Sequence, residues 1–148
     1  MLNKATVYQA VFKEISQKEA RISDAFDDLN SAVANDSKST AGDKHETGRA
    51  MIHLEQEKLA LQLEQVKILR EAFAQINVDE VHSTIQFGSL VKTNKGLFFF
   101  SVGLGKIEVG NESVFCLTVT TPLGRVLEGK KVGDVVEFNG KIEVLGVG

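Results

Sequence analysis

Apolar residues recur every seven positions along two segments of the N-terminal half: Tyr8, Ile15, Ile22 and Leu29 in the first, and Ile52, Leu59, Val66 and Phe73 in the second. A heptad repeat places such residues on one face of an α-helix, where a second helix can cover them. A further row is expected beside the first series: Val11, Ala25 and Ala32, widened by Phe12, Phe26 and Val33. Two such helices with a short connection fold back as an antiparallel coiled-coil hairpin. We predict helices over about residues 5–35 and 43–76.

A short polar segment separates the two heptad series. Residues 39–51, STAGDKHETGRAM, contain two glycines, two carboxylates and three basic or imidazole side chains. The apolar periodicity stops before this segment and resumes after it. We therefore predict a polar tip near residues 36–48, at the far end of the hairpin.

The second half of the chain follows a different pattern. Residues 81–148 contain 11 of the 13 glycines and the only proline. Short runs with alternating apolar residues predict strands, and they cover residues 84–93, 96–103, 105–110, 112–120, 135–140 and 141–147. The segment TPLGRVLEGKKVGD predicts one short helix, with Pro122 near its start and Gly129 just past its end. Strand alternation is expected to bury every second phenylalanine between residues 87 and 115.

These patterns predict an α+β protein with two domains. Residues 1–79 form the coiled-coil hairpin, and residues 80–148 form a small antiparallel sheet domain covered by one short helix. The formal net charge of −3 does not favour a strong phosphate-binding surface. Apolar runs long enough to cross a bilayer are absent, so no membrane partner is expected and the chain is predicted to be cytoplasmic. Cys116, the single cysteine, lies in a strand-like run and is expected to be a buried apolar residue.

Two motifs resemble the bacterial Gre transcript-cleavage factors of the GreA and GreB type. The segment TTPLGRVLEGKKVGDVVEF at 120–138 resembles the C-terminal signature of that family, which also occurs in relatives that do not cleave RNA. Asp43 and Glu46 match the Asp-x-x-Glu pair of the Gre hairpin tip. The two motifs lie in the family's order and span nearly the whole chain. The resemblance implies an FKBP-like C-terminal domain.

The resemblance also implies a function in transcription elongation. The chain would bind RNA polymerase, insert its coiled coil in the secondary channel, and stimulate cleavage of backtracked RNA near the RNA 3′ end. It would not itself be an enzyme and would have no small-molecule substrate, because the polymerase performs the Mg²⁺-dependent cleavage. Asp43 and Glu46 would help to hold a second Mg²⁺ jointly with the polymerase, since Mg²⁺ is commonly bound by one or two carboxylates. No metal is expected on the free protein.

The same resemblance assigns two further groups of residues. The turn Thr121-Pro122-Leu123-Gly124 is expected to be exposed and to help bind the C-terminal domain to the polymerase. Lys38, Lys44 and Arg49 are candidates for contact with RNA phosphate, although solvated tip charges are the simpler interpretation. Asp43 also has capping-box spacing from Thr40, so a helix cap is an alternative role for its carboxylate.

The tip departs from the Gre pattern directly after Glu46. Gre tips usually continue with Asn-Ala-Glu-Tyr, whereas this chain has Thr47-Gly48-Arg49-Ala50. The cation at Arg49 favours an alternative function, a regulator that occupies the polymerase channel without stimulating cleavage. Prolyl isomerisation is weakly supported, because the chain has no tryptophan and its only tyrosine, Tyr8, lies in a helix. A structural coiled-coil dimer is a further alternative, which the polar segment between the two series disfavours.

Overall fold

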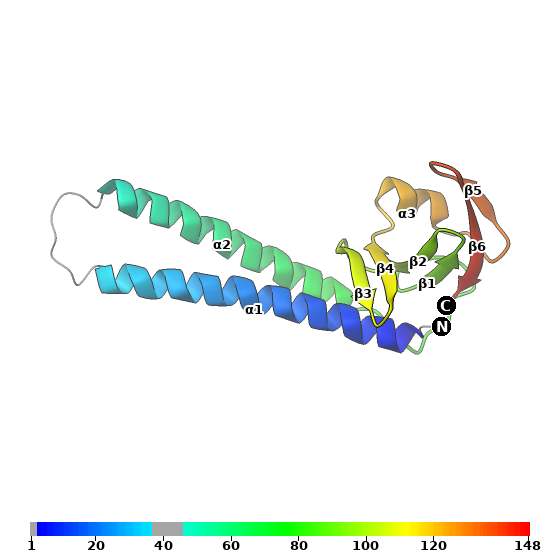
Figure 1. Ribbon diagram of the computed structural model, residues 1–148, viewed down its shortest axis with the longest axis horizontal. Coiled ribbons are helices and arrows are strands. Elements are labelled where there is room, and N and C mark those ends of the chain that lie inside the picture. Colours follow the sequence, from blue (N-terminus) through cyan, green and yellow to red (C-terminus); the bar gives the residue numbers. More distant parts are fainter. Residues whose placement is uncertain (1–2, 37–45) are drawn as a thin grey trace. The chain divides into compact units, whose positions relative to one another are not determined.

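The computed structural model describes residues 3–36 and 46–148. Two long helices, α1 (Lys4–Asp36) and α2 (Glu46–Phe73), occupy the N-terminal half (Figure 1). They run antiparallel: Arg70 Nη1 donates to Glu19 Oε1 at 2.6 Å, and Gln56 Nε2 donates to Asn30 Oδ1 at 2.7 Å. The prediction of two antiparallel helices is confirmed. Residues 37–45, which make up most of the predicted tip, lie outside the described residues.

The second row of the α1 seam differs from the predicted one. Ala25 and Ala32 are exposed, whereas Phe26 and Val33 are partly buried. Along unit 2 the row therefore follows the first heptad series by four residues rather than three, which turns the larger apolar side chains inward and the alanines outward. Nearer the start of α1 the predicted row holds, because Val11 is buried and Phe12 is exposed. Glu19 also lies in this row. A search for apolar residues does not select Glu19. Its carboxylate is accommodated in the seam because Arg70 of α2 donates a hydrogen bond to it.

Six strands form one sheet in the order β3-β4-β2-β1-β6-β5. Their bounds are β1 Leu90–Thr93, β2 Gly96–Phe100, β3 Gly105–Val109, β4 Glu112–Leu117, β5 Val135–Glu137 and β6 Lys141–Val147. The prediction of an antiparallel sheet holds for four of the five strand pairings, and the fifth, between β2 and β4, is parallel. The chain leaves β2 and forms β3 as an outer strand. It then returns as β4 between β3 and β2, and this path makes β2 and β4 run in the same direction.

Five of the six predicted runs are longer than the strands they contain, and the difference is largest for the first run. Only residues 90–93 of the run 84–93 form strand β1. The preceding part turns at Gly88, whose φ is 92°, and Gln86 N donates to Ser89 Oγ there. At the other end, the run 112–120 leaves the sheet after Leu117 to begin the turn into the helix α3 (Pro122–Leu127).

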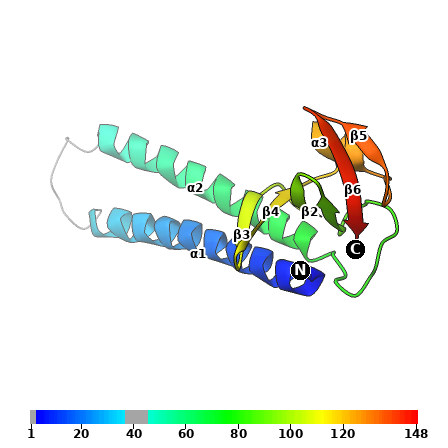
Figure 2. The same cartoon turned by 45° about the vertical axis from the view of Figure 1, so that its right-hand side comes forward.

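The helix α3 packs on one face of the sheet (Figures 1 and 2). The apolar core between them consists of buried residues from the strands, the helix and residue 85: Ile85, Val91, Phe98, Phe100, Leu117, Leu127, Val136, Ile142 and Val144. Burial of this core holds the helix against the sheet, so that the two form the two packed layers of the unit.

The other face of the sheet is also covered near its middle. Phe99 is fully buried and lies edge-to-face with Phe73, at a centroid distance of 6.2 Å. Tyr8 stacks on Phe73 at 4.5 Å. Phe98, Phe99 and Phe100 are therefore all buried, and the expectation that every second phenylalanine is exposed fails on β2. Alternation predicts exposure only where one face of a strand meets water.

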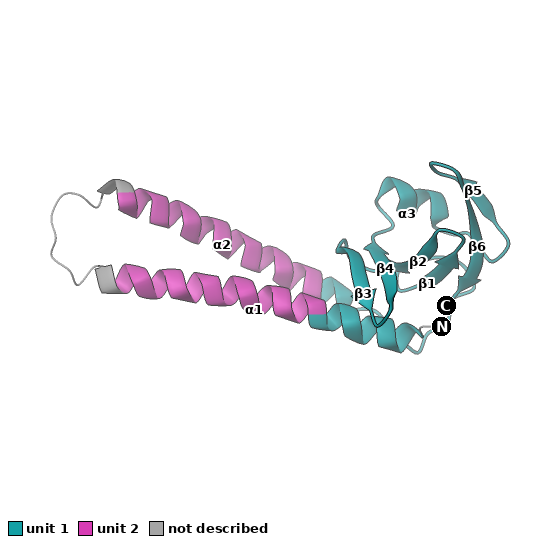
Figure 3. Cartoon of the chain, viewed as in Figure 1, with its two compact units in different colours: residues 1–13, 71–148 teal, residues 14–70 magenta. Residues whose placement is uncertain are grey.

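The chain divides into two compact units, drawn in different colours in Figure 3. Unit 1 comprises residues 1–13 and 71–148, and unit 2 comprises residues 14–70. The short helical stretches that carry Tyr8 and Phe73 therefore belong to the same unit as the sheet. The boundary between residues 79 and 80, which rests on composition, stays a prediction. None of the helices in the described ranges is long and apolar enough to cross a membrane.

The Glu19–Arg70 pair provides a test of the seam. Arg70→Met leaves Glu19 without its hydrogen-bond donor, and Glu19 Oε2 is already buried without a partner among the described residues. We expect a loss of about 1 kcal/mol in the free energy of unfolding, measured by urea denaturation, because the pair is only partly buried. The double variant Glu19→Leu, Arg70→Met should recover at least that loss. Lys67→Met, at an exposed position of α2, is the control. A double variant less stable than Arg70→Met would contradict this account.

Candidate functional site

The predicted tip residues fall mostly outside the described part of the chain. Asp43, Lys38 and Lys44 lie there, and at Glu46, where α2 begins, the backbone alone is described. The assignment of Asp43 and Glu46 as carboxylate ligands to Mg²⁺ therefore stays a prediction. In residues 3–36 and 46–148 themselves, no group of three histidine, cysteine or carboxylate side chains is arranged to hold a metal ion.

The described helix ends determine where the tip segment attaches. Because α1 and α2 are antiparallel, the end of α1 at Asp36 and the start of α2 at Glu46 lie at the same end of unit 2. The first N–H groups of a helix lack intrahelical partners, so negative charge is favoured at the start of α2.

Gly48 and Arg49 lie near the start of α2. Arg49 is exposed. A Cβ added at Gly48 would have no described atom within 4 Å, so packing against the described residues does not require glycine there. Glycine inside a helix nevertheless costs about 1 kcal/mol relative to alanine. The first turn of α2 thus combines a glycine with an exposed cation, Arg49, for which no ion pair within 4.0 Å is found among the described residues.

The turn Thr121-Pro122-Leu123-Gly124 is the first turn of α3. Thr121 is the N-cap: its Oγ1 accepts a hydrogen bond from Gly124 N at 3.0 Å and donates to Thr118 O at 2.9 Å. Pro122 occupies the first helical position, where its missing N–H costs nothing. Residues within the motif and just before it are therefore sufficient to start this helix.

Exposure differs within this turn. Pro122 is exposed, Leu123 packs partly against the core, and Gly124 is buried. The expectation of an exposed turn thus holds for Pro122 but not for Gly124. At Gly124 a Cβ would lie 2.1 Å from Thr118 O and 2.9 Å from Val119 Cα. Glycine is required there because the helix start crosses the end of β4 in direct backbone contact.

A buried histidine, which sequence reasoning did not select, links the start of α1 to the segment before β1. His82 Nδ1 lies 2.7 Å from Ser89 Oγ, and its Nε2 lies 3.6 Å from Glu80 Oε1. Lys4 Nζ donates to the carbonyl oxygen of Glu80 at 2.7 Å. Since Ser89 Oγ already accepts from Gln86 N, its hydroxyl hydrogen is free to donate to His82 Nδ1.

This environment favours the neutral imidazole. Burial lowers the pKa of His82, the nearby Lys4 ammonium lowers it further, and Glu80 raises it only in part. The cluster has no sequence signature, because Lys4 is separated from Glu80 by most of the hairpin. Only the folding back of α2 brings the two segments together.

Cys116 behaves as predicted. It is buried in β4, and burial raises the pKa of its thiol to about 11, while a hydrogen bond with Ser101 acts in the opposite direction. A thiol with such a pKa is almost fully protonated near neutral pH and is a poor nucleophile.

Comparison with known proteins gives a limited result. No model of a protein family matches the chain, and no curated protein matches it. Among solved structures, GreA factor homolog 1 (Gfh1) of Thermus thermophilus is similar at 13% identity, with 93% of this chain and 94% of that chain covered and a TM-score of 0.38. A second structure of the transcription factor Gfh1 is 14% identical, with 93% of both chains covered and a TM-score of 0.38. Similarity at this level assigns neither a family nor a function.

Gly124 is a test of the close packing at the start of α3. Gly124→Ala should lower the free energy of unfolding by about 1–3 kcal/mol, as an overpacked site does, because the added methyl group meets Thr118 O. Gly103→Ala, where a Cβ would meet nothing within 4 Å, should change it by less than about 0.5 kcal/mol. Chemical denaturation of both variants measures the difference. Equal effects of the two substitutions would show that the contact does not constrain residue 124.

The His82 cluster predicts a pH dependence of stability. Because the folded protein lowers the pKa of His82 below 6.5, its contribution to stability is fully present above pH 6.5. That contribution is lost as the pH falls from 6.5 through the folded pKa. Urea denaturation between pH 8 and pH 5 should show this loss, and His82→Gln should reduce it. His53→Gln, at an exposed position of α2, is the control substitution. A pH profile that is the same with and without His82 would refute the prediction.

Proposed function

We propose that this chain is a bacterial transcription elongation factor that binds RNA polymerase and stimulates cleavage of backtracked RNA. The observation that carries the proposal is the order of its parts. Two antiparallel helices are joined at one end by a polar segment with the Asp43-x-x-Glu46 pair, and a glycine-rich sheet unit follows, in which Thr121-Pro122-Leu123-Gly124 starts a short helix. In the sequence, one Gre-like motif thus lies between the two helices and the other at the start of α3.

A helical hairpin is suited to entering a narrow channel. Two packed helices, each about 10–12 Å in diameter, form a slender element. The exposed residues of α1 in unit 2 include small and charged side chains: Ala25, Asp24, Asp28, Lys18 and Arg21. Placing the polar tip of such a hairpin in the secondary channel would bring its carboxylates near the polymerase active site.

The proposed chemistry assigns a limited role to the chain itself. Asp43 and Glu46 would supply carboxylate oxygens, the ligands that Mg²⁺ prefers, and would orient a water molecule. Remaining ligands and the catalytic machinery would come from the polymerase, so the free chain would bind Mg²⁺ poorly. Lys38, Lys44 and Arg49 would meet phosphate groups of the RNA near its 3′ end.

The sheet unit would bind the outside of the polymerase through the start of α3. Pro122 is exposed there and is held rigidly, because Thr121 caps the helix and Gly124 packs against Thr118. A rigid exposed proline binds with little loss of conformational entropy. Thr121, Leu123 and Gly124 would act mainly by holding this surface in shape.

The alternative is a channel-binding regulator without cleavage activity, and the exposed Arg49 in the first turn of α2 favours it. A cation close to the acidic pair would compete with a metal ion for the carboxylates. Cleavage assays on stalled elongation complexes separate the two functions, because both require polymerase binding and only one requires RNA hydrolysis.

Asp43→Ala and Glu46→Ala are the direct test of the proposed function. Each should retain polymerase binding but lose most stimulated cleavage, because each removes an oxygen ligand or a water-orienting group. Cleavage rates are measured on stalled elongation complexes over a range of Mg²⁺ concentrations. Raising Mg²⁺ should restore part of the lost rate, since mass action offsets weaker binding.

Glu57→Ala is the matched control, because it removes an exposed carboxylate from α2 outside the first turn. It should leave cleavage unchanged. Full cleavage activity in both tip variants would remove the carboxylate mechanism. Absence of stimulated cleavage by the unmodified protein, with polymerase binding intact, would establish the regulator instead, and Arg49→Ala would then be the first variant to examine.

A further inference from the structure

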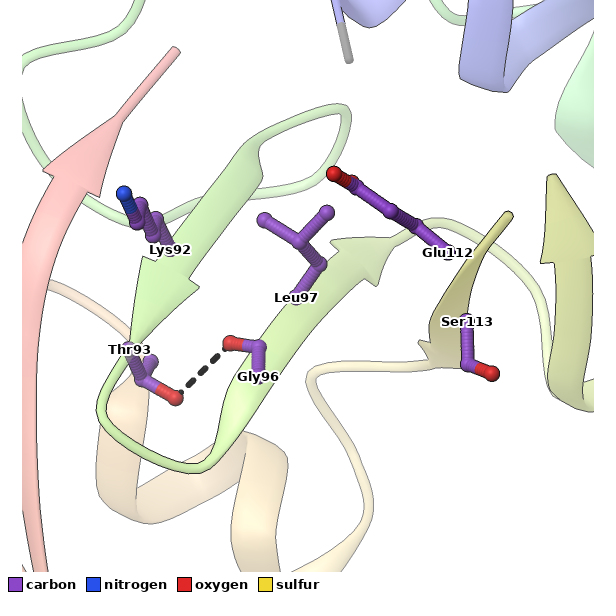
Figure 4. Close-up of a pocket in the computed structure, with 6 residues that line it drawn as sticks. All are labelled: Lys92, Thr93, Gly96, Leu97, Glu112 and Ser113. Carbon is purple, nitrogen blue, oxygen red and sulfur yellow. Dashed lines mark hydrogen bonds between the residues drawn. The ribbon is translucent and has the colours of Figure 1, made fainter. Parts of the chain in front are cut away.

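A pocket of about 510 Å³ opens on unit 1 beside the β1–β2 turn and the start of β4 (Figure 4). Its volume lies within the range of small-molecule sites. Six residues line it: Lys92, Thr93, Gly96, Leu97, Glu112 and Ser113. All six belong to three neighbouring strands or the turn between two of them, so the pocket is formed within one part of the sheet.

Strand register explains why three of the side chains meet in this pocket. Lys92 of β1 pairs with Leu97 of β2, and Leu97 pairs with Val114 of β4. Glu112 precedes Val114 by two residues, so it lies on the same face of the sheet. Figure 4 shows Lys92, Leu97 and Glu112 projecting to the same side, with Leu97 in the middle. The neighbours Val91 and Phe98 point into the apolar core on the opposite face.

The two charged groups of the pocket are free to bind a ligand. Lys92 and Glu112 are both exposed, and neither forms an ion pair within 4.0 Å in the described part of the chain. By strand spacing, the two backbones are about 9–10 Å apart across β2. The Lys92 ammonium and the Glu112 carboxylate thus lie on either side of Leu97, which is partly buried.

The two hydroxyl groups are already engaged. Thr93 Oγ1 donates to Gly96 O at 2.9 Å and accepts from Lys95 N at 3.0 Å. Ser113 Oγ donates to Glu108 Oε1 at 2.8 Å, and it points away from the other lining side chains (Figure 4). Recognition in this pocket therefore depends on the ammonium, the carboxylate and the apolar surface between them.

We propose that this pocket binds a small zwitterionic molecule whose carboxylate and ammonium groups are joined by a short apolar chain. The ligand carboxylate pairs with Lys92, the ligand ammonium pairs with Glu112, and the apolar chain covers Leu97. A ligand with adjacent charges, such as glycine, is too short to reach both groups. A ligand with one charge leaves the other protein charge unpaired. The ligand is bound without reaction, so the proposal is separate from polymerase binding and from RNA cleavage.

The affinity expected for such a site is weak. Both charges are solvated, and an exposed ion pair contributes on the order of a two- to five-fold change in affinity. A dissociation constant in the millimolar range follows, which NMR titration measures well. The probe is 6-aminohexanoate, added to the ¹⁵N-labelled full chain.

The expected result is a saturable shift of the backbone amide signals of residues 92–97 and 112–113. Hexanoate, hexylamine and glycine serve as matched ligands that lack one charge or the required length. Each should bind at least two-fold more weakly than 6-aminohexanoate. Equal affinity of hexanoate and 6-aminohexanoate, or shifts spread evenly over the chain, would overturn the proposal.

Variants at the pocket separate specific binding from general charge effects. Lys92→Met and Glu112→Gln should each weaken 6-aminohexanoate binding by about two- to five-fold, and the double variant should bind it no better than hexanoate. Lys106→Met is the control, because Lys106 is an exposed cation on β3 that faces the other side of the sheet through its pairing with Phe115. An equal loss in Lys106→Met would show that net charge, rather than the pocket, determines binding.

Discussion

Burial of β2 on both faces is the constraint on which unit 1 depends. Phe98 and Phe100 face α3 and the main core, while Phe99 faces Phe73 on the other side. Each buried phenylalanine removes a large apolar area from water, and burying one fully stabilises a fold by about 1.5–3 kcal/mol. Since Phe73 is in α2 and Tyr8 stacks on it from α1, the sheet and the adjoining helical stretches share one core. The strand at the centre of the sheet therefore cannot change register without exposing one of these rings.

The hairpin in unit 2 relies on a different balance. Its seam contains apolar residues such as Ile15 and Val66, but also two polar contacts, Glu19 with Arg70 and Asn30 with Gln56. Polar groups in a seam add little stability. They can favour one register, because any sliding of the helices would separate donors from acceptors. A defined register also determines which residues of α1 and α2 lie opposite each other in unit 2.

Local structural requirements account for each residue at the start of α3. Each residue of the sequence Thr-Pro-Leu-Gly has a structural role. The threonine caps the helix, the proline occupies the first helical position, the leucine contacts the core, and the glycine avoids a clash with Thr118 O. A motif of this kind identifies a fold feature more securely than an activity. What the structure adds is that Pro122 alone among the four is exposed, so a partner would meet that residue first.

Local pattern determined most elements of this protein, and tertiary structure decided how they pair. Heptads, glycine spacing and the proline were sufficient to predict two long helices, short strands and α3, because each depends on residues close in the chain. The parallel pairing of β2 with β4, the burial of His82 beside Lys4, and the placement of Lys92 and Glu112 around Leu97 could not be predicted in this way. These features join residues that are distant in sequence, and only the packing of a common core determines which of them meet.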